Sequence, residues 1–318
     1  MAAWAGRHFS LGRGPRGKLC ADGLNYTYLL EQGRKKHALR LYRPGWRSAE
    51  QVDFELAQLR FLHAVGLPVA RPLPAKDGRF SVPVRLADGP SRGVLFSFAP
   101  GSPRPEKPVL PAAKQVGTLL ARLHEAQDLF APKAALPPMD QQRLVSLPLA
   151  QLRPFKASFG EDWAWLQSSA ALIRRSLDRL PKTAPAFGLI HGDPHNWNMN
   201  YDAKTGVYTL FDFDLSTRGW RLFDLATFLW GSGWPEKGFG AGSRALLQSY
   251  AQQRPLSPVE LRELPAMMAA RHLWWMGFQA SLAWRTGTEA VMPIVHQRKL
   301  AFLRRWRSGK LAKQLRVG

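Results

Sequence analysis

The sequence contains 318 residues, of which 45% are hydrophobic and 12 are tryptophan, so it can bury a sizeable core and is not a disordered chain. Its formal net charge of +22 predicts attraction to nucleotides, phosphates, nucleic acid or anionic surfaces. The single cysteine excludes an internal disulfide, and the N-terminal residues show no signal peptide or membrane span, so we expect a cytoplasmic protein without a membrane partner.

The first hundred residues predict strands and one helix. Alternating side chains over 19–42 predict a hairpin, with strands LNYTYLLE and ALRLY joined by the turn GRKKH. Apolar residues at helical spacing predict a helix that begins after Ser48 and stops at Gly66. The segment GVLFSFAPG is typical of a buried strand that ends in a proline-glycine break.

The pattern becomes mainly helical after the proline-rich segment Pro100–Pro111. The segments PAAKQVGTLLARLHEAQ and EDWAWLQSSAALIRRSLDRL have apolar residues at 3.6-residue spacing. Two short apolar strands, FGLI and YTLFDF, flank the polar segment HGDPHNWNMN, and further helices follow. We therefore expect an N-terminal nucleotide-covering lobe over 1–100 and a catalytic and substrate lobe over 101–318.

Polar side chains with metal and acid-base chemistry follow these two strands. Carboxylates buried close together are unfavourable unless a cation compensates them, so we expect a metal-phosphate site at the strand ends. Asp193 and Asn198 have the spacing of the kinase catalytic loop, in which the aspartate is the base and the asparagine binds magnesium. Asp212 follows on the strand TLFDF, where a kinase places a second magnesium ligand.

The segments HGDPHNWNM and LFDFDLSTRGWRLFDLATF resemble the aminoglycoside phosphotransferase and choline kinase superfamily. The segment ALRLYRPGW resembles the bacterial stress-response kinase branch in particular. The resemblance covers roughly 20–290 and implies an α+β, bilobal protein-kinase-like fold, with a small antiparallel-sheet lobe and a mainly helical lobe. It also implies an ATP- and Mg²⁺-dependent phosphotransferase, with both cofactors bound between the lobes.

The resemblance implies a role for each matching residue. Asp193 is the catalytic base, and Asn198 and Asp212 are the magnesium ligands. Arg40 stands where the family usually has a lysine on the nucleotide phosphates. Its carboxylate partner on the next helix is Glu55, with Glu50 as the competing candidate.

Further upstream residues are implied to contact the nucleotide. Asn25, beside Gly23, lies at the tip of the hairpin that covers the phosphates, and backbone groups from Ser97 to Ala99 meet the adenine. His191 resembles a histidine that supports the metal-binding loop.

Asp214 and Asp224 follow Asp212 closely in the sequence. Asp224 opens the helix DLATFLW, which favours an N-cap. Asp214 is either a second metal contact or an exposed loop residue. The short interval from Asp212 to Asp224 leaves no room for a long activation loop, so regulation by phosphorylation of such a loop is not expected.

Two alternatives come from other functional classes. His191, Asp193 and His195 could begin a dinuclear metallohydrolase site that is completed by Asp212 and Asp214. The second alternative is a catalytically weak kinase-like protein that binds nucleic acid or an acidic partner. Its candidate stacking surface is Trp274, Trp275 and Trp284 beside Arg271.

The net charge also bears on the phosphoryl acceptor. Aminoglycosides are polycations, and a strongly positive protein attracts them poorly. We therefore expect a neutral or anionic hydroxyl compound, or serine and threonine side chains of an acidic protein.

Overall fold

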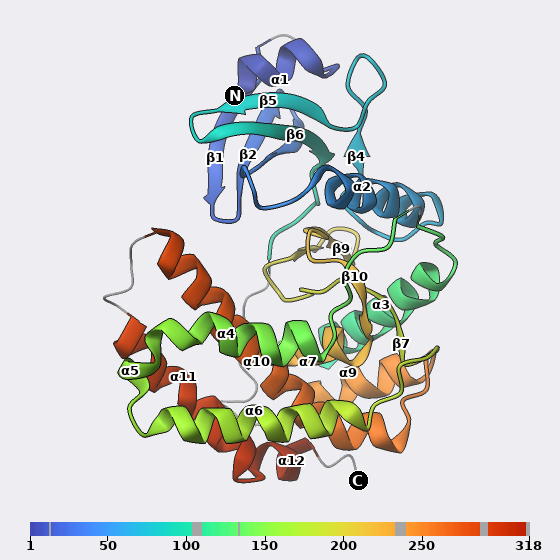
Figure 1. Cartoon of the computed structure of the whole chain (residues 1–318). Helices are drawn as coiled ribbons and strands as arrows, with labels where there is room; N and C mark the ends of the chain where they lie inside the picture. The colour runs from blue at the N-terminus through green and yellow to red at the C-terminus, as the bar shows by residue number, and fades with distance from the viewer. Residues whose placement is uncertain (13, 104–109, 133, 233–239, 287–291, 316–318) are drawn as a thin grey trace. The chain divides into compact units, whose positions relative to one another are not determined.

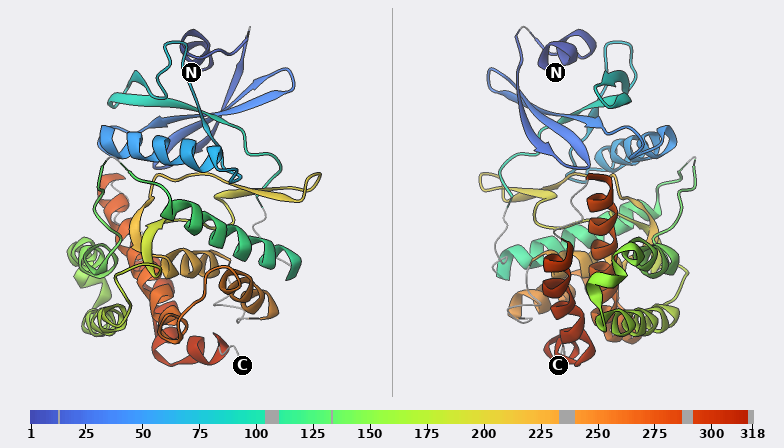
Figure 2. Two further views of the ribbon diagram at one scale, coloured as in Figure 1. Left: turned by 90° about the vertical axis from the view of Figure 1, so that its right-hand side faces the viewer. Right: turned by 60° about the vertical axis from the view of Figure 1, so that its left-hand side comes forward.

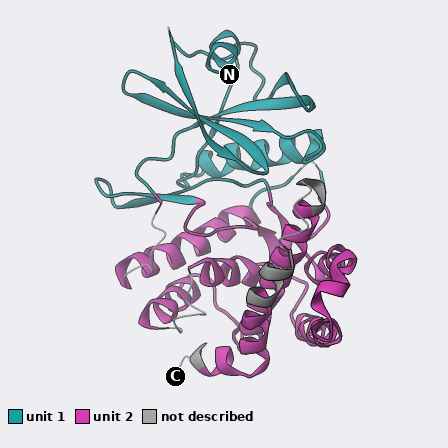
Figure 3. Cartoon of the chain, turned by 90° about the vertical axis from the view of Figure 1, so that its left-hand side faces the viewer, with its two compact units in different colours: residues 1–102, 129–135, 199–214 teal, residues 103–128, 136–198, 215–318 magenta. Residues whose placement is uncertain are grey.

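The computed structural model describes residues 1–12, 14–103, 110–132, 134–232, 240–286 and 292–315. The chain forms two compact units, shown in teal and magenta in Figure 3. Unit 1 contains 1–102, 129–135 and 199–214, and unit 2 contains 103–128, 136–198 and 215–318. The assignment of 1–100 to nucleotide covering and of 101–318 to catalysis and substrate binding stays a prediction.

Unit 1 is built on an antiparallel sheet with the strand order β1-β2-β3-β6-β4, and β5 pairs with β6 (Figure 1). Its core contains Leu30, Leu39, Leu41 and Leu95, all of which are buried, and Phe9 packs against it from the chain start. The elements that surround this core are α1 (Ala2–His8), β1 (Arg16–Asp22), β2 (Asn25–Gln32), β3 (Lys35–Tyr42), β4 (Pro72–Leu73), β5 (Val82–Leu86) and β6 (Gly89–Ser97).

The predicted hairpin is present as β2 and β3, with two differences. Gln32 pairs with Lys35, so the turn holds only Gly33 and Arg34, and strand β3 begins earlier than predicted. Gly33 supports this tight turn with a φ of 56°. The strand β1 was not predicted, because all of its residues are exposed and the sequence therefore lacks the alternation that marks a half-buried strand.

The predicted helix after Ser48 is α2 (Ala49–Ala64). The Ser48 hydroxyl accepts a hydrogen bond from the Gln51 N–H, and the Gln51 side chain accepts one from the Ser48 N–H. This capping box satisfies two N–H groups at the helix start. The helix places Glu55 on its buried face, which brings the carboxylate to the sheet.

The two predicted apolar strands, FGLI and YTLFDF, belong to different sheets. β7 (Phe187–Ile190) pairs with β10 (Thr217–Trp220) in unit 2, whereas β8 (Met199–Asp202) pairs with β9 (Val207–Leu210) in unit 1. Asp212 follows the end of β9 and does not lie on the strand itself. Its φ of 67° is rare for a residue other than glycine.

Unit 2 is mainly helical, and Figure 2 shows its helices from two sides. The predicted helices over PAAKQVGTLLARLHEAQ and EDWAWLQSSAALIRRSLDRL are present as α3 and α6, and α6 is shorter than predicted at both ends. No helix in the described part of the chain is both long and apolar enough to cross a membrane. The helical elements are α3 (Leu110–Asp128), η1 (Gln142–Ser146), α4 (Leu147–Leu152), η2 (Arg153–Phe155), α5 (Lys156–Phe159), α6 (Asp162–Asp178), α7 (Leu222–Gly231), α9 (Ala241–Ala251), α10 (Pro258–Thr286), α11 (Met292–Arg307) and α12 (Lys310–Leu315).

Candidate active site

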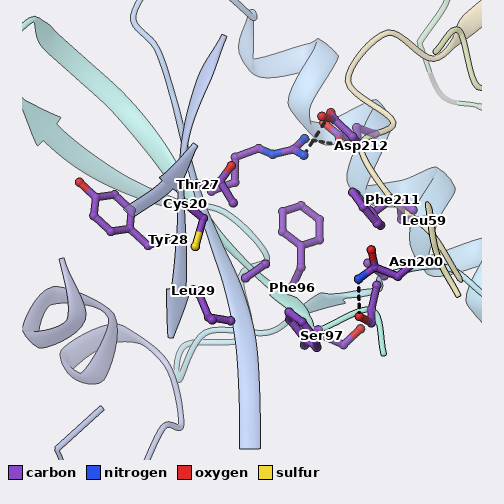
Figure 4. Close-up of a pocket in the computed structure, with 16 residues that line it drawn as sticks. Cys20, Thr27, Tyr28, Leu29, Leu59, Phe96, Ser97, Asn200, Phe211 and Asp212 are labelled. Atoms are coloured by element: carbon purple, nitrogen blue, oxygen red, sulfur yellow. Dashed lines mark hydrogen bonds and ion pairs between the residues drawn. The ribbon is translucent and has the colours of Figure 1, made fainter. Parts of the chain in front are cut away.

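Unit 1 contains a pocket between its sheet, α2 and the β8–β9 hairpin (Figure 4). Most of its wall is apolar, and charged side chains gather on one part of it. The Asn200 side chain donates a 2.8 Å hydrogen bond to the Ala99 carbonyl at the segment after β6. The lining residues are Cys20, Thr27, Tyr28, Leu29, Ala38, Arg40, Glu55, Leu59, Ala70, Phe96, Ser97, Phe98, Ala99, Asn200, Phe211 and Asp212.

Arg40 is the cation of this pocket, and its side chain is buried. Its Nη1 lies 3.1 Å from Glu55 Oε1, and its Nη2 lies 3.1 Å from Asp212 Oδ1. Burial alone would lower the pKa of Arg40, but Asp212 and Glu55 raise it well above its ordinary value. Glu50, the competing candidate, is exposed, so Glu55 is the carboxylate that contacts Arg40.

Asp214 is a second buried carboxylate in unit 1. Its Oδ2 accepts 3.1 Å hydrogen bonds from Asn25 Nδ2 and from Trp46 Nε1. Burial, together with the charge of Asp212, raises the pKa of Asp214 to about 6. Asp214 is 4% exposed, so the interpretation as an exposed loop residue is wrong. Asn25 lies at the start of β2 with its amide on Asp214, and its contact with phosphates stays a prediction.

The charges around Arg40 fit a divalent cation. Glu55, Asp212 and Asp214 all act on Arg40, and Arg47 is a second cation near Glu55 and Asp214. Three carboxylates still outnumber two arginines, so negative charge is in excess unless a carboxylate takes up a proton or a cation binds. The contact between Arg40 and Asp212 Oδ1 is an ion pair without hydrogen-bond direction, and this buried oxygen has no hydrogen-bond partner among the described residues. Such an oxygen is a suitable magnesium ligand.

Replacing Arg40 tests the part in nucleotide binding that the sequence predicts for it. Arg40→Lys keeps the positive charge and is expected to change the dissociation constant for ATP by less than about fivefold. Arg40→Met removes a charged contact and should weaken ATP binding by at least about tenfold. Isothermal titration calorimetry measures both, with Arg85→Met, an exposed arginine on β5, as the control. Equal affinities for all three variants would remove Arg40 from the nucleotide site.

The catalytic-loop residues predicted from the sequence lie together in unit 2. Asn198 Nδ2 donates a 3.0 Å hydrogen bond to the Asp193 main-chain oxygen and lies 3.4 Å from Asp193 Oδ2. Because the amide nitrogen faces Asp193, the Asn198 oxygen is on the opposite branch, where it could bind a cation. His191 is buried, and its Nδ1 accepts a hydrogen bond from the Asp193 N–H at 3.3 Å. This contact is consistent with a supporting role.

The Asp193 carboxylate has two further charged or polar neighbours. Arg271 Nη2 lies 2.6 Å from Oδ1, and His195 Nε2 lies 3.3 Å from Oδ2. Burial alone would raise the pKa of Asp193, but Arg271 and His195 hold it well below its usual range. The carboxylate is therefore ionised and can accept a proton. Arg271 was not predicted as part of this site, since it is distant in sequence and carries no local motif.

The predicted N-cap role of Asp224 is wrong, because Asp224 lies inside the first turn of α7, whose N-cap is Arg221. Its carboxylate is fully buried and accepts hydrogen bonds from the N–H groups of His191 at 2.7 Å and Gly192 at 2.9 Å. His124 Nε2, from α3, lies 3.0 Å from the same carboxylate. Asp224 thus anchors the start of the catalytic loop to the helices of unit 2.

Asp224→Asn is expected to lower the free energy of unfolding by about 3 kcal/mol, because the amide keeps one acceptor oxygen and places an N–H group against buried donors. Thermal or urea unfolding measures the loss. Glu125→Gln, which changes an exposed carboxylate on α3, is the matched control and should be within about 0.5 kcal/mol of wild type. Equal stabilities for the two variants would contradict the anchoring role.

The alternative site types receive no support from the geometry. Nowhere in the described ranges do three His, Cys, Asp or Glu side chains form a metal-binding group, as a dinuclear metallohydrolase would need. Trp274 stacks on Phe278 at 5.5 Å, and Trp275 lies 5.5 Å from Trp230, so both rings are packed within unit 2. The side chain of Trp284 lies outside the described residues.

Comparisons with known proteins cover most of the chain. Residues 19–263 match the model of the phosphotransferase enzyme family. A homoserine kinase of Rhodospirillum rubrum is 30% identical over 81% of this chain and 78% of its own length. A microcompartment-associated aminopropanol kinase superposes with a TM-score of 0.76 and 22% identity over 100% of this chain and 99% of that one. The amicoumacin kinase hAmiN was solved with AMP-PNP, Ca²⁺ and Ami. It superposes with a TM-score of 0.72 and 19% identity over 98% of this chain and 92% of that one. These structures confirm the predicted α+β kinase-like fold.

Proposed function

Because the chain belongs to the phosphotransferase enzyme family and is a kinase for a hydroxyl group of a small molecule, we propose that its phosphoryl donor is ATP and its metal ion is Mg²⁺. The predicted resemblance to the phosphotransferase family is thereby confirmed, and the resemblance to its stress-response kinase branch stays a prediction. ATP and Mg²⁺ are the finer part of this assignment, and they rest on the residues described above.

The observation that carries the proposal is the composition of the unit 1 pocket. Its apolar wall, with Leu59 and Phe96, suits a flat purine base, whereas Arg40 and Asp212 suit phosphates and their metal ion. Ser97, Phe98 and Ala99 line the same pocket, and their main-chain groups are proposed to bind the adenine edge. The hAmiN complex with AMP-PNP and Ca²⁺ agrees with a nucleotide and a divalent metal as ligands of this fold.

Each proposed residue has one role in the transfer. Arg40, held by Glu55, would bind the phosphates, and Asn198 and Asp212 would hold Mg²⁺, which would neutralise charge on the phosphates. Asp193 orients the acceptor hydroxyl and takes its proton as the hydroxyl oxygen bonds to the terminal phosphorus. The bond from that phosphorus to the bridging oxygen breaks, and ADP leaves with the electron pair.

We further propose that the acceptor is a small amino alcohol or hydroxy amino acid. Homoserine and aminopropanol, named for two related kinases, both combine a hydroxyl with an amino group. A protein of net charge +22 repels a single ammonium group less strongly than it repels the several positive charges of an aminoglycoside.

A transfer screen tests the function and the acceptor together. The purified protein is incubated with γ-labelled ATP, Mg²⁺ and separate pools of amino alcohols, hydroxy amino acids, sugars and lysate protein. We expect label in one of the first two pools and none after chelation of the metal. Label only in protein would overturn the acceptor class, and no transfer to any pool, together with no ATP binding by calorimetry, would overturn the proposed function.

A further inference from the structure

Arg271 is a buried cation in direct contact with the proposed base. It comes from α10, its side chain is 3% exposed, and its Nη2 lies 2.6 Å from Asp193 Oδ1. Both residues belong to unit 2. A contact this short between a guanidinium and a carboxylate is a charge-assisted hydrogen bond, which directs the carboxylate as well as attracting it.

Two indole rings hold the guanidinium. The Arg271 Cζ atom lies 4.6 Å from the ring centroid of Trp230 and 4.6 Å from that of Trp274. Trp274 is itself stacked on Phe278 with an interplanar angle of 4°, and Trp230 Nε1 donates a 2.9 Å hydrogen bond to His272 Nδ1. Because both rings have their own packing partners, the guanidinium has little freedom to turn away from Asp193.

The burial of Arg271 is poorly compensated by hydrogen bonds. Its Nε and Nη1 atoms are buried and have no hydrogen-bond partner in the part of the chain that the structure describes. Buried N–H groups without partners destabilise the folded state, so a neutral side chain of similar length would satisfy the packing better. We therefore attribute the arginine at this position to its effect on Asp193 and not to a contribution to the stability of the folded state.

The other Asp193 oxygen is directed by the loop itself. His195 Nδ1 accepts the Trp197 N–H at 3.1 Å, so the proton of a neutral His195 ring is on Nε2, which faces Asp193 Oδ2. Asn198 Nδ2 approaches the same oxygen at 3.4 Å. Arg271 is thus the sole described cation on Oδ1, and without it the carboxylate could rotate about its last bond.

We propose that Arg271 is a positioning residue, which fixes the plane of the Asp193 carboxylate so that the carboxylate is oriented to take the proton of the acceptor hydroxyl. This role rests on the proposed kinase function. Arg271 acts only through Asp193 and does not itself contact the acceptor. The rate of transfer should therefore depend on Arg271 only while Asp193 is present.

The kinetic test is a double-mutant cycle. Arg271→Met keeps the length of the side chain and removes its donors, and it is expected to lower kcat about a hundredfold while the KM for ATP changes less than twofold. Arg271→Lys should recover part of this loss. In an Asp193→Asn background, adding Arg271→Met should change kcat less than twofold. Rates are measured with γ-labelled ATP and with homoserine, 1-amino-2-propanol or water as the acceptor.

Arg304→Met is the matched control for this cycle. Arg304 Nη2 also lies 2.6 Å from an aspartate Oδ1, that of Asp162, but its side chain is 54% exposed. Its removal should leave kcat unchanged. A kcat for Arg271→Met within twofold of wild type, or an equal loss in both backgrounds, would overturn the positioning role.

A second cycle uses the melting temperature and needs no activity. Asp193→Asn leaves Arg271 as a buried cation without a counter-charge, so its melting temperature should fall, and adding Arg271→Met should recover most of that fall. Shifts that simply add would overturn the inference even in an active kinase. A wild-type protein without transfer to any acceptor would overturn the proposed function and the positioning role with it, whereas coupled melting temperatures would still establish the ion pair.

Discussion

Asp193→Asn is expected to lower kcat for phosphoryl transfer by about a thousandfold and to leave the dissociation constant for ATP unchanged. The amide cannot accept the proton of the acceptor hydroxyl. It also loses the negative charge that lies 2.6 Å from Arg271 Nη2 and 3.3 Å from His195 Nε2. Initial rates with γ-labelled ATP measure the loss, and calorimetry measures ATP binding.

Two further variants test whether the loss of kcat is specific to Asp193. Asp178→Asn, which changes an exposed aspartate at the end of α6, should retain the wild-type rate. His195→Gln keeps a polar side chain beside Asp193 and should lower kcat by about tenfold or less, since the carboxylate remains. An Asp193→Asn variant that transfers phosphate at more than about a tenth of the wild-type rate would assign the base to another residue.

Elements with local signals were predictable from the sequence. The helix α2 has its capping box at Ser48 and Gln51 and its apolar face at helical spacing, and all of these signals lie within the helix and its cap. The loop from Asp193 to Asn198 was predicted in the same way, because its function requires two residue types at one spacing. In the structure the Asn198 side chain donates to the Asp193 main-chain oxygen and lies 3.4 Å from Asp193 Oδ2.

Residues that act across long sequence intervals were not predictable. Asp224 looks like an N-cap, yet its partners are main-chain N–H groups of His191 and Gly192, far upstream. Arg271 contacts Asp193 from a helix that carries an ordinary apolar pattern. Such pairs depend on how the helices of unit 2 pack together, so no periodicity or spacing in one segment indicates them.

The burial of Asp214 could not be predicted from the sequence either. Its position two residues after Asp212 fits both a metal contact and a loop residue, and the sequence offers no means of choosing. The structure buries its carboxylate against Trp46 and Asn25, which come from the first fifty residues. The environment of this carboxylate is therefore a property of the tertiary fold.

Asp212→Asn is expected to lower kcat/KM at fixed Mg²⁺ by at least about a thousandfold, because loss of a charged ligand removes several kcal/mol of metal-dependent stabilisation. Asparagine is the substitution of choice, since it tolerates the φ of 67° at this position better than alanine does. Titration of the rate with Mg²⁺ should show a higher metal requirement. Asp202→Asn, at the end of β8 and outside the pocket, is the control.

The variant also removes a partner of Arg40, so the metal effect must be separated from an effect on the arginine. Asp212 Oδ1 lies 3.1 Å from Arg40 Nη2, and Glu55 alone would remain beside the guanidinium. ATP binding in the presence of chelator isolates this second effect, since no metal takes part. If Asp212 is a magnesium ligand, Asp212→Asn should bind metal-free ATP as wild type does, or more tightly, because a negative charge is lost. Weaker binding of metal-free ATP, with an unchanged Mg²⁺ requirement, would mean that Asp212 serves to orient Arg40.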